Sequence, residues 1–197
     1  MKTDQVNELL YQALETERGG QKVYETALRC AQNSDLKKEW EGYLDETRTH
    51  EQRLLEVFAA FGLNPEEQTP GRAVVKHIGE SLVKAMEMAL ASGTPEGAEL
   101  VAAECVVHAE TKDHQNWELL GKVAEKMTGD GAKALLAAYE EIEGQEDHHL
   151  YHTKGFSREL WIQSLGMPAV LPPPEEQKDV KTAIGAARAK QVRTEMT

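Results

Sequence analysis

The sequence predicts an all-α protein: a four-helix bundle with a long helical crossover between its second and third helices and a C-terminal tail helix. Apolar residues recur at spacings of three and four along most of the 197 residues, which is the period of an amphipathic helix. β-branched residues are scattered and do not alternate with polar ones, so strands are not indicated. Glycine, proline and asparagine gather at a few points between the periodic segments and mark the turns.

The first two helices are expected to form an antiparallel hairpin. The first is predicted from about residue 3 to residue 32, where the polar turn Asn33-Ser34-Asp35 follows. The second is predicted from about residue 35 to residue 61, because Gly62 and Asn64-Pro65 stop a helix. The short turn between the two helices makes them antiparallel.

A longer connection separates this hairpin from the next pair of helices. It starts with a loop that holds two prolines and Gly71. Apolar residues from Val74 to Met86 then mark a helix that ends near Ser92-Gly93. A connection of about 30 residues is what a four-helix bundle with one crossover requires.

The second hairpin begins at Thr94 and Pro95, which suit the N-cap and the first position of a helix. This helix is predicted to continue to about Met127, before the turn Thr128-Gly129-Asp130-Gly131. The last main helix is predicted over residues 132–165. Because the turn is again short, these two helices are also expected to be antiparallel.

The chain is expected to divide after residue 166, where Gly166-Met167-Pro168 ends the last main helix. Residues 170–174 (VLPPP) read as a polyproline-type connector. From about residue 177 to residue 193, a small apolar stripe predicts a tail helix; its members are Val180, Ala183, Ile184 and Ala187. We therefore expect a bundle domain over 1–166, and a connector and tail helix over 167–197 that docks on the bundle or on a second copy.

Composition and charge narrow the possible partners. The chain has 34 acidic and 22 basic residues and a formal charge of −12, which argues against nucleic-acid binding. It contains no apolar run near the length of a membrane span, and its polar N-terminus does not resemble a signal peptide. Cys30 and Cys105 form no CxxC pair, and both are expected to be buried thiols. A reduced, cytoplasmic setting is therefore predicted.

A carboxylate and an imidazole share the apolar face of the last main helix. Glu146 and His149 stand three residues apart, on the same face as Leu135, Ile142 and Phe156. Burying two such groups is costly unless they have a partner, and a metal ion suits both. Glu-x-x-His is therefore a candidate half-site of a metal-binding helical bundle.

Three further candidates lie on the inward faces of the other main helices. Glu17 shares a face with apolar residues of the first helix, His50 of the second and Glu110 of the third. Within each hairpin, the candidates are nearly equally far from the turn, so at about 1.5 Å of rise per residue they differ in depth by only a few ångströms. This convergence predicts one metal-binding pocket formed by Glu17, His50, Glu110, Glu146 and His149.

Simpler interpretations of single residues remain open. Alone, Glu17 can lie at the edge of its face and pair with an arginine, and a lone inward histidine such as His50 is more often a hydrogen-bonded core residue than a ligand. Other candidates lie at the edges of the inward faces: Glu46, Glu51 and His152. Others are expected on the surface: Glu104, His108 and His148.

The pattern resembles the ferritin-like di-iron carboxylate superfamily, in which two helices supply one Glu each and two supply Glu-x-x-His. The segment ETERGGQKVY, which contains Glu17 and Tyr24, is similar to the first-helix ligand and tyrosine of that family. DETRTHEQRLLEVF resembles the second-helix motif and includes His50, and its part ETRTHEQRLLEVF is also similar to bacterial stress-induced proteins of the YciF type. HAETKDH resembles the third-helix region of rubrerythrins and includes Glu110 and Asp113. GQEDHH contains Glu146 and His149, which correspond to the Glu-x-x-His pair of the last helix.

The resemblance implies a bound iron centre, with one or two ions, or a manganese centre that reacts with O₂ or peroxide in an oxidoreductase of ferroxidase or peroxidase type. Glu17, Glu110 and Glu146 would neutralise the metal charge, and His50 and His149 would each provide one nitrogen. Glu46 and Asp113 are possible extra ligands. A homodimer is the expected assembly.

The sequence departs from this family at one ligand, because Thr47 stands where the second-helix glutamate, which bridges two metals in the family, is expected. The site can then be mononuclear, an altered dinuclear centre or a degenerate one. The absence of CxxC pairs excludes a complete rubrerythrin. A non-catalytic stress or interaction protein that associates through its tail is the alternative; iron storage and a zinc hydrolase receive less support from the sequence.

Overall fold

The computed structural model describes residues 2–170 and 183–195 of the chain. Its helices are α1 (Thr3–Cys30), α2 (Ser34–Phe61), α3 (Pro70–Ser92), α4 (Pro95–Ala124), α5 (Asp130–Ser164) and α6 (Ala183–Glu195). The described residues contain no β-strand, which confirms the all-α prediction. None of their helices is both long and apolar enough to cross a membrane.

The helix ends follow the capping signals in the sequence. The side chain of Asn33 accepts hydrogen bonds from the backbone N–H groups of Asp35 and Leu36 and so begins α2, while Gly62, with φ of 66°, ends it. Thr94 caps α4 as expected. Helix α3 begins at Pro70, earlier than the apolar pattern indicated, because Thr69 caps it through the N–H of Arg72 and proline fits its first turn.

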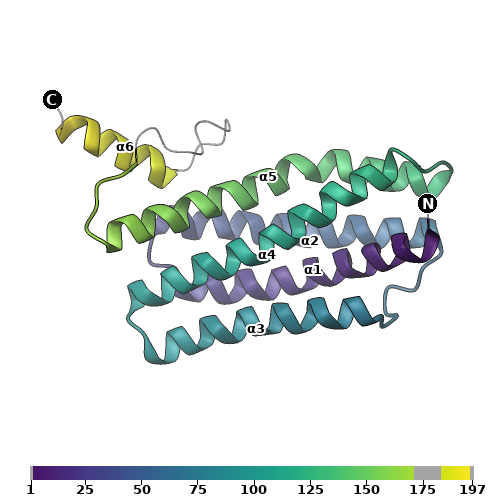
Figure 1. Cartoon of the computed structure of the whole chain (residues 1–197), viewed down its shortest axis with the longest axis horizontal. Helices are drawn as coiled ribbons and strands as arrows, with labels where there is room; N and C mark the ends of the chain where they lie inside the picture. The colour runs from purple at the N-terminus through teal and green to yellow at the C-terminus, as the bar shows by residue number, and fades with distance from the viewer. Residues whose placement is uncertain (1, 171–182, 196–197) are drawn as a thin grey trace.

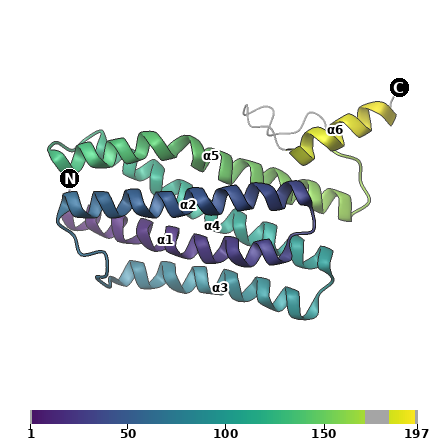
Figure 2. The ribbon, with the colours of Figure 1, turned by 180° about the vertical axis from the view of Figure 1, so that it is seen from behind.

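The five long helices lie side by side (Figures 1 and 2). Helices α1, α2, α5 and α4 contact one another in a closed ring, and α3 packs outside this ring against α1 and α4. Neighbours in the ring run in opposite directions, because α3 returns the chain along the length of the molecule before α4 begins (Figure 1). Four inward helix faces therefore meet along one axis.

The loop between α2 and α3 is fixed by a buried ion pair. The Nε atom of Arg72 lies 2.8 Å from Oε2 of Glu15 on α1, and its Nη1 donates to the carbonyl oxygens of Pro65 and Glu67. Only 2% of Arg72 is exposed. Further along, the backbones of α1 and α3 come close at Gly19 and Gly79, where a Cβ added to Gly79 would lie 3.7 Å from Cα of Gly19.

Two apolar clusters form the core inside the ring. One includes Tyr24, Trp40 and Phe156, and the other includes Leu10, Phe58 and Trp117. The inward-facing acidic and histidine residues belong to neither cluster. Polar groups thus interrupt an otherwise apolar interior. Their burial costs free energy of folding unless they gain hydrogen bonds, ion pairs or a bound ion.

The tail helix docks on the same chain, against α5 and α2. Arg188 of α6 contacts the end of α5 and the segment after it. Its Nε lies 2.9 Å from Oε2 of the buried Glu159, and its Nη2 donates to the carbonyl oxygen of Met167. Of the predicted apolar stripe, Ala187 is exposed and Ala189 is buried instead. Val180 and the side chains of Ala183 and Ile184 lie outside the described residues.

Candidate metal centre

The five residues predicted to form one pocket meet inside the ring of helices. Glu17 comes from α1, His50 from α2, Glu110 from α4, and both Glu146 and His149 from α5. Each is at most 3% exposed. The convergence inferred from helix faces and depth is therefore present in the structure.

These residues form two groups that share one carboxylate. Glu17, His50 and Glu146 make the first group, and Glu110, Glu146 and His149 make the second. Within each group, one potential ligand atom from each residue lies within 4.8 Å of the others. Glu146 is thus shared by two adjacent groups, each of which could hold a metal ion.

In the first group, Nδ1 of His50 lies 3.1 Å from Oε1 of Glu146 and 3.7 Å from Oε1 of Glu17. In the second group, Nδ1 of His149 lies 3.5 Å from Oε2 of Glu110 and 3.7 Å from Oε1 of Glu146. The two imidazole rings are stacked, with centroids 5.6 Å apart. The two positions are therefore close enough to share Glu146.

Each histidine is oriented by a hydrogen bond on its outer nitrogen. Nε2 of His50 lies 2.8 Å from Oε1 of Gln145, and Nε2 of His149 lies 2.7 Å from Oε2 of Glu46. Such bonds direct the other ring nitrogen, Nδ1, toward the interior, as hydrogen-bond partners on the outer nitrogen do for metal-binding histidines. Glu46, a predicted extra ligand, thus contacts the outer side of His149 rather than the inward-facing atoms.

Two of the carboxylates are also held by a single donor each. Nε1 of Trp117 donates to Oε1 of Glu17 at 2.8 Å, and the hydroxyl of Tyr24 donates to Oε1 of Glu110 at 2.8 Å. The other oxygen of each carboxylate has no hydrogen-bond partner. The protein thus holds one oxygen of each carboxylate in place and leaves the second oxygen available to a metal ion.

Among the described residues, the centre contains a concentration of buried polar atoms that no hydrogen bond satisfies. They are Oε2 of Glu17, Nδ1 of His50, Oε2 of Glu110, Oδ1 of Asp113, both Oε atoms of Glu146, and Nδ1 of His149. Buried polar atoms without partners are rare, and each requires a specific explanation. Apart from Asp113, the residues that carry these atoms belong to the two groups, so cations held there would satisfy them together.

The ionisation of the centre shows how strongly its charges interact. Burial alone would lower the pKa of His50, but Glu146 and Glu17 raise it to about 11. His149 is also buried, yet Glu110 and Glu46 raise its pKa to about 9. Burial raises the pKa of Glu146 to about 7 despite the opposing effect of His50. Without metal, protons on these groups balance the excess of buried carboxylates.

Asp113, the second predicted extra ligand, lies one turn beyond Glu110 on α4 and is 4% exposed. Burial raises its pKa well above the usual value, and the charges of Glu17, Glu146 and Glu110 raise it further. Its Oδ1 has no partner. Asp113 therefore belongs to the surroundings of the centre as a fourth buried carboxyl group.

Thr47 occupies the inward position where a second bridging carboxylate was expected. It is 3% exposed, and its hydroxyl donates to the backbone carbonyl of Tyr43 at 2.8 Å. This hydrogen bond satisfies the hydroxyl within its own helix. Glu51 does not replace the missing carboxylate, because it pairs with Arg18 and Gln21 at the edge of the molecule.

The remaining sequence candidates lie outside the centre. Glu104, His108 and His148 are exposed, as expected, and Glu104 accepts a hydrogen bond from Nε1 of Trp161. His152 lies at the edge, where its Nδ1 is 2.9 Å from the hydroxyl of Tyr43. Sequence reasoning did not identify the orienting roles of Gln145 and Trp117. Each bonds to a residue on another helix, Gln145 to His50 and Trp117 to Glu17, so no spacing within one helix could have indicated these roles.

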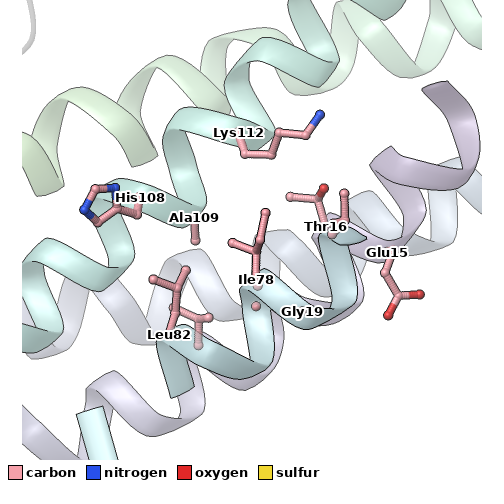
Figure 3. A pocket seen from close by; sticks show the side chains of 12 residues that line it. Glu15, Thr16, Gly19, Ile78, Leu82, His108, Ala109 and Lys112 are labelled. Atoms are coloured by element: carbon pink, nitrogen blue, oxygen red, sulfur yellow. The ribbon is translucent and has the colours of Figure 1, made fainter. Parts of the chain in front are cut away.

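A cavity of about 170 Å³ between α4 and α5 reaches the centre. Glu146 and Trp117 line it together with more exposed residues such as Glu118 and Asp147. A second cavity, of about 60 Å³, lies between α1, α3 and α4 (Figure 3). Residues such as Ile78, Leu82 and Ala109 line this second cavity, and none of the five metal candidates does.

The chain was also compared with models of protein families, with curated proteins and with solved structures. None of these comparisons gave a match. The interpretation of the centre therefore rests on its own residues and on their geometry.

Proposed function

We propose that this chain is a divergent ferritin-like protein whose buried centre binds two ions of iron or manganese and takes part in redox reactions with O₂ or peroxide. In this interpretation, α1, α2, α4 and α5 are the four-helix bundle and α3 is its long crossover. The observation that carries the proposal is the set of unsatisfied carboxylate and imidazole atoms around Glu146.

The donor set fits divalent iron or manganese. Carboxylate oxygens and imidazole nitrogens suit both ions, whereas a thiolate-rich set would indicate zinc or copper(I). Glu17, Glu110, Glu146 and Asp113 together carry four negative charges when ionised, which balance two divalent ions. Glu146 would bridge the ions, while His50 and His149 would give one nitrogen to each.

The protein would contribute orientation, charge balance and restricted access. Gln145 and Glu46 hold the two imidazoles, and Trp117 and Tyr24 hold two of the carboxylates. When bound, iron or manganese supplies one-electron chemistry that the side chains themselves lack. The cavity beside Glu146 and Trp117 gives a small oxidant a path toward the centre.

Metal content tests this proposal directly. Protein purified from cells supplied with iron or manganese is expected to hold two metal ions per chain, one for each group. Glu146→Ala should lower this number to one or fewer, whereas Glu140→Ala, an exposed change on the same helix, should leave it unchanged. Less than one ion per several chains, or an unaltered content in Glu146→Ala, would contradict the proposal.

Reactivity is tested separately. The iron(II)-loaded protein, mixed anaerobically with peroxide or exposed to O₂, is expected to develop near-ultraviolet absorption of iron(III) bound by carboxylates. Tight binding without oxidation would instead favour the second candidate, a non-catalytic stress or interaction protein. That candidate is motivated by Thr47, which removes one bridging carboxylate. A homodimer remains a prediction, and sedimentation of the chain with and without residues 168–197 tests whether the tail contributes to it.

A further inference from the structure

The cavity between α4 and α5 extends from exposed residues to a buried carboxylate. Its volume is about 170 Å³, and Glu146 lines it although only 1% of this residue is exposed. Among the described residues, neither carboxylate oxygen of Glu146 has a hydrogen-bond partner. Because an unpartnered buried carboxylate is costly, its position on the wall of a cavity points to a ligand of opposite charge that enters there.

Further carboxylates gather in the outer part of this cavity. Glu118 of α4 lines it together with Glu143 and Asp147 of α5, and none of the described residues that line it is a lysine or an arginine. Glu118 and Glu143 are exposed. Burial raises the pKa of Tyr139, another wall residue, and the neighbouring carboxylates, Glu143 first among them, raise it further. The cavity is therefore negatively charged from its mouth to its inner wall.

Contacts between the two helices hold the walls of the cavity in place. Nε2 of His114 on α4 lies 2.8 Å from Oδ1 of Asp147 on α5. The ring of Tyr139 packs directly on the backbone of α4, where a Cβ added to Gly121 would lie 2.5 Å from Cε2 of the tyrosine. Trp117, a further wall residue, donates a hydrogen bond to a carboxylate of the centre. The cavity is thus part of the packed α4–α5 interface, and one of its walls contacts the centre.

We propose that this cavity is the entrance through which hydrated divalent cations reach the buried centre, and that Glu118 and Glu143 capture them at its mouth. A cleft lined by charges of one sign concentrates ions of the opposite sign and speeds their association by about tenfold to a thousandfold. Of the five residues of the centre, Glu146 alone lines the cavity, so it is the first ligand that an entering ion meets. The destination of the ion rests on the proposed function, whereas its capture at the mouth does not.

The size of the cavity suits a partly hydrated ion. A water molecule occupies about 30 Å³ in the liquid. A volume of about 170 Å³ therefore leaves room for a cation together with several of its waters. The ion can lose the remaining waters where Glu146 offers its two unpartnered oxygens.

The rate at which the centre takes up cobalt(II) tests the entrance. Glu118→Gln combined with Glu143→Gln removes two negative charges from the mouth. After rapid mixing at low ionic strength, this variant should develop cobalt(II) absorption about tenfold more slowly than the unaltered protein. The final absorption should be the same, because both residues are exposed and neither belongs to the centre.

A matched control separates the mouth from the overall charge. Glu80→Gln combined with Glu87→Gln removes two exposed carboxylates from α3 and changes the net charge equally. This control should take up cobalt(II) at nearly the unaltered rate. Because salt shortens the Debye length to about 3 Å at 1 M, the two double variants should differ much less in concentrated salt. Equal rates of the two variants at low ionic strength would overturn the entrance, even where the centre binds metal.

Terbium(III) detects capture at the mouth without the centre. Like calcium, it is a hard cation that prefers oxygen ligands, and nearby aromatic side chains such as Trp117 and Tyr139 sensitise its emission. Glu146→Ala removes the ligand that the two groups share. In this background, the changes at Glu118 and Glu143 should abolish most of the sensitised emission, whereas the α3 control changes should preserve it.

The two experiments separate the proposals. Emission that depends on Glu118 and Glu143, in a protein whose centre takes up no cobalt(II), would support capture at the mouth and contradict the proposed function. Emission that is equal in the mouth variant and the α3 control would overturn capture at the mouth, whatever the centre binds.

Discussion

The Nδ1 atom of His50 and Oε1 of Glu146 face each other across 3.1 Å, in a position where neither side chain is more than 2% exposed. An ion pair so deeply buried is rarely a net source of stability, because removing both charges from water costs about as much as their attraction returns. Leu or Phe would fill the same space at lower cost. The arrangement is therefore better explained by a ligand that both groups bind than by packing.

Metal binding is expected to stabilise the folded chain. An ion that binds only the folded state raises the free energy of unfolding by about 2.7 kcal/mol at 100 times its dissociation constant. Thermal unfolding of the metal-free protein, repeated with manganese(II), measures this gain. Glu110→Gln should reduce the gain, because it replaces a ligand carboxylate without changing its size. A melting temperature that does not respond to manganese or iron would contradict the prediction.

Metal binding should also release protons. In the metal-free protein, the pKa values of about 11 for His50 and about 9 for His149 keep both imidazoles protonated at pH 7. A metal ion binds only the deprotonated nitrogen, so affinity should rise with pH, by about tenfold per unit for each proton displaced. The increase should be steepest below about pH 9, the pKa of His149, and should continue less steeply toward about pH 11, the pKa of His50. Calorimetry in two buffers of different ionisation enthalpy counts the protons, and a count of zero would contradict this prediction.

Thr47→Glu is expected to make the fold more dependent on metal. The change places a further carboxylate among Glu17, Glu110 and Glu146, and burying an unpaired charge costs several kcal/mol. The metal-free variant should therefore melt at a lower temperature than the unaltered protein, while its metal affinity should increase. Thr47→Val serves as the control, since it keeps the shape without the charge. Equal melting temperatures for the metal-free Glu variant and the control would show that position 47 does not face the centre.

Arg72→Ala should destabilise the protein independently of metal. The change leaves the carboxylate of Glu15 and the carbonyls of Pro65 and Glu67 without their shared donor. Breaking a buried ion pair in this way typically costs about 3–5 kcal/mol. Denaturant unfolding measures the effect, with Arg48→Ala as an exposed arginine control that is expected to have little influence. A loss as small as that of the control would mean that the packing of α3 against α1 does not depend on Arg72.

Much of this molecule could be predicted from the sequence. The capping residues Asn33 and Thr94 and the stop at Gly62 placed the helix ends, because capping is a local interaction between neighbours in the chain. The inward positions of Glu17, His50, Glu110, Glu146 and His149 followed from helical periodicity. Their common depth followed from the short turns, since helical rise is nearly constant.

The side-chain contacts between different helices could not be predicted from capping residues or helical periodicity. The sequence left Glu46 as a possible ligand, but only the packing of α2 against α5 placed its carboxylate on the outer nitrogen of His149. The contact of Trp117 with Glu17 joins residues 100 positions apart. Periodicity gives the face of a helix on which a residue lies, but not the rotation and crossing of the partner helix that decide which atoms meet.

By itself, the sequence determined the helical class, the turns and the five inward candidates, because these depend on local propensity and on the period of one helix. Only the tertiary structure decided that Glu146 is shared by two groups, that Asp113 adds a buried carboxyl group beside them, and that the hydroxyl of Thr47 bonds to its own helix. Those relationships depend on distances of a few ångströms between side chains on different helices. Side-chain packing sets such distances, and no spacing within a single helix encodes them.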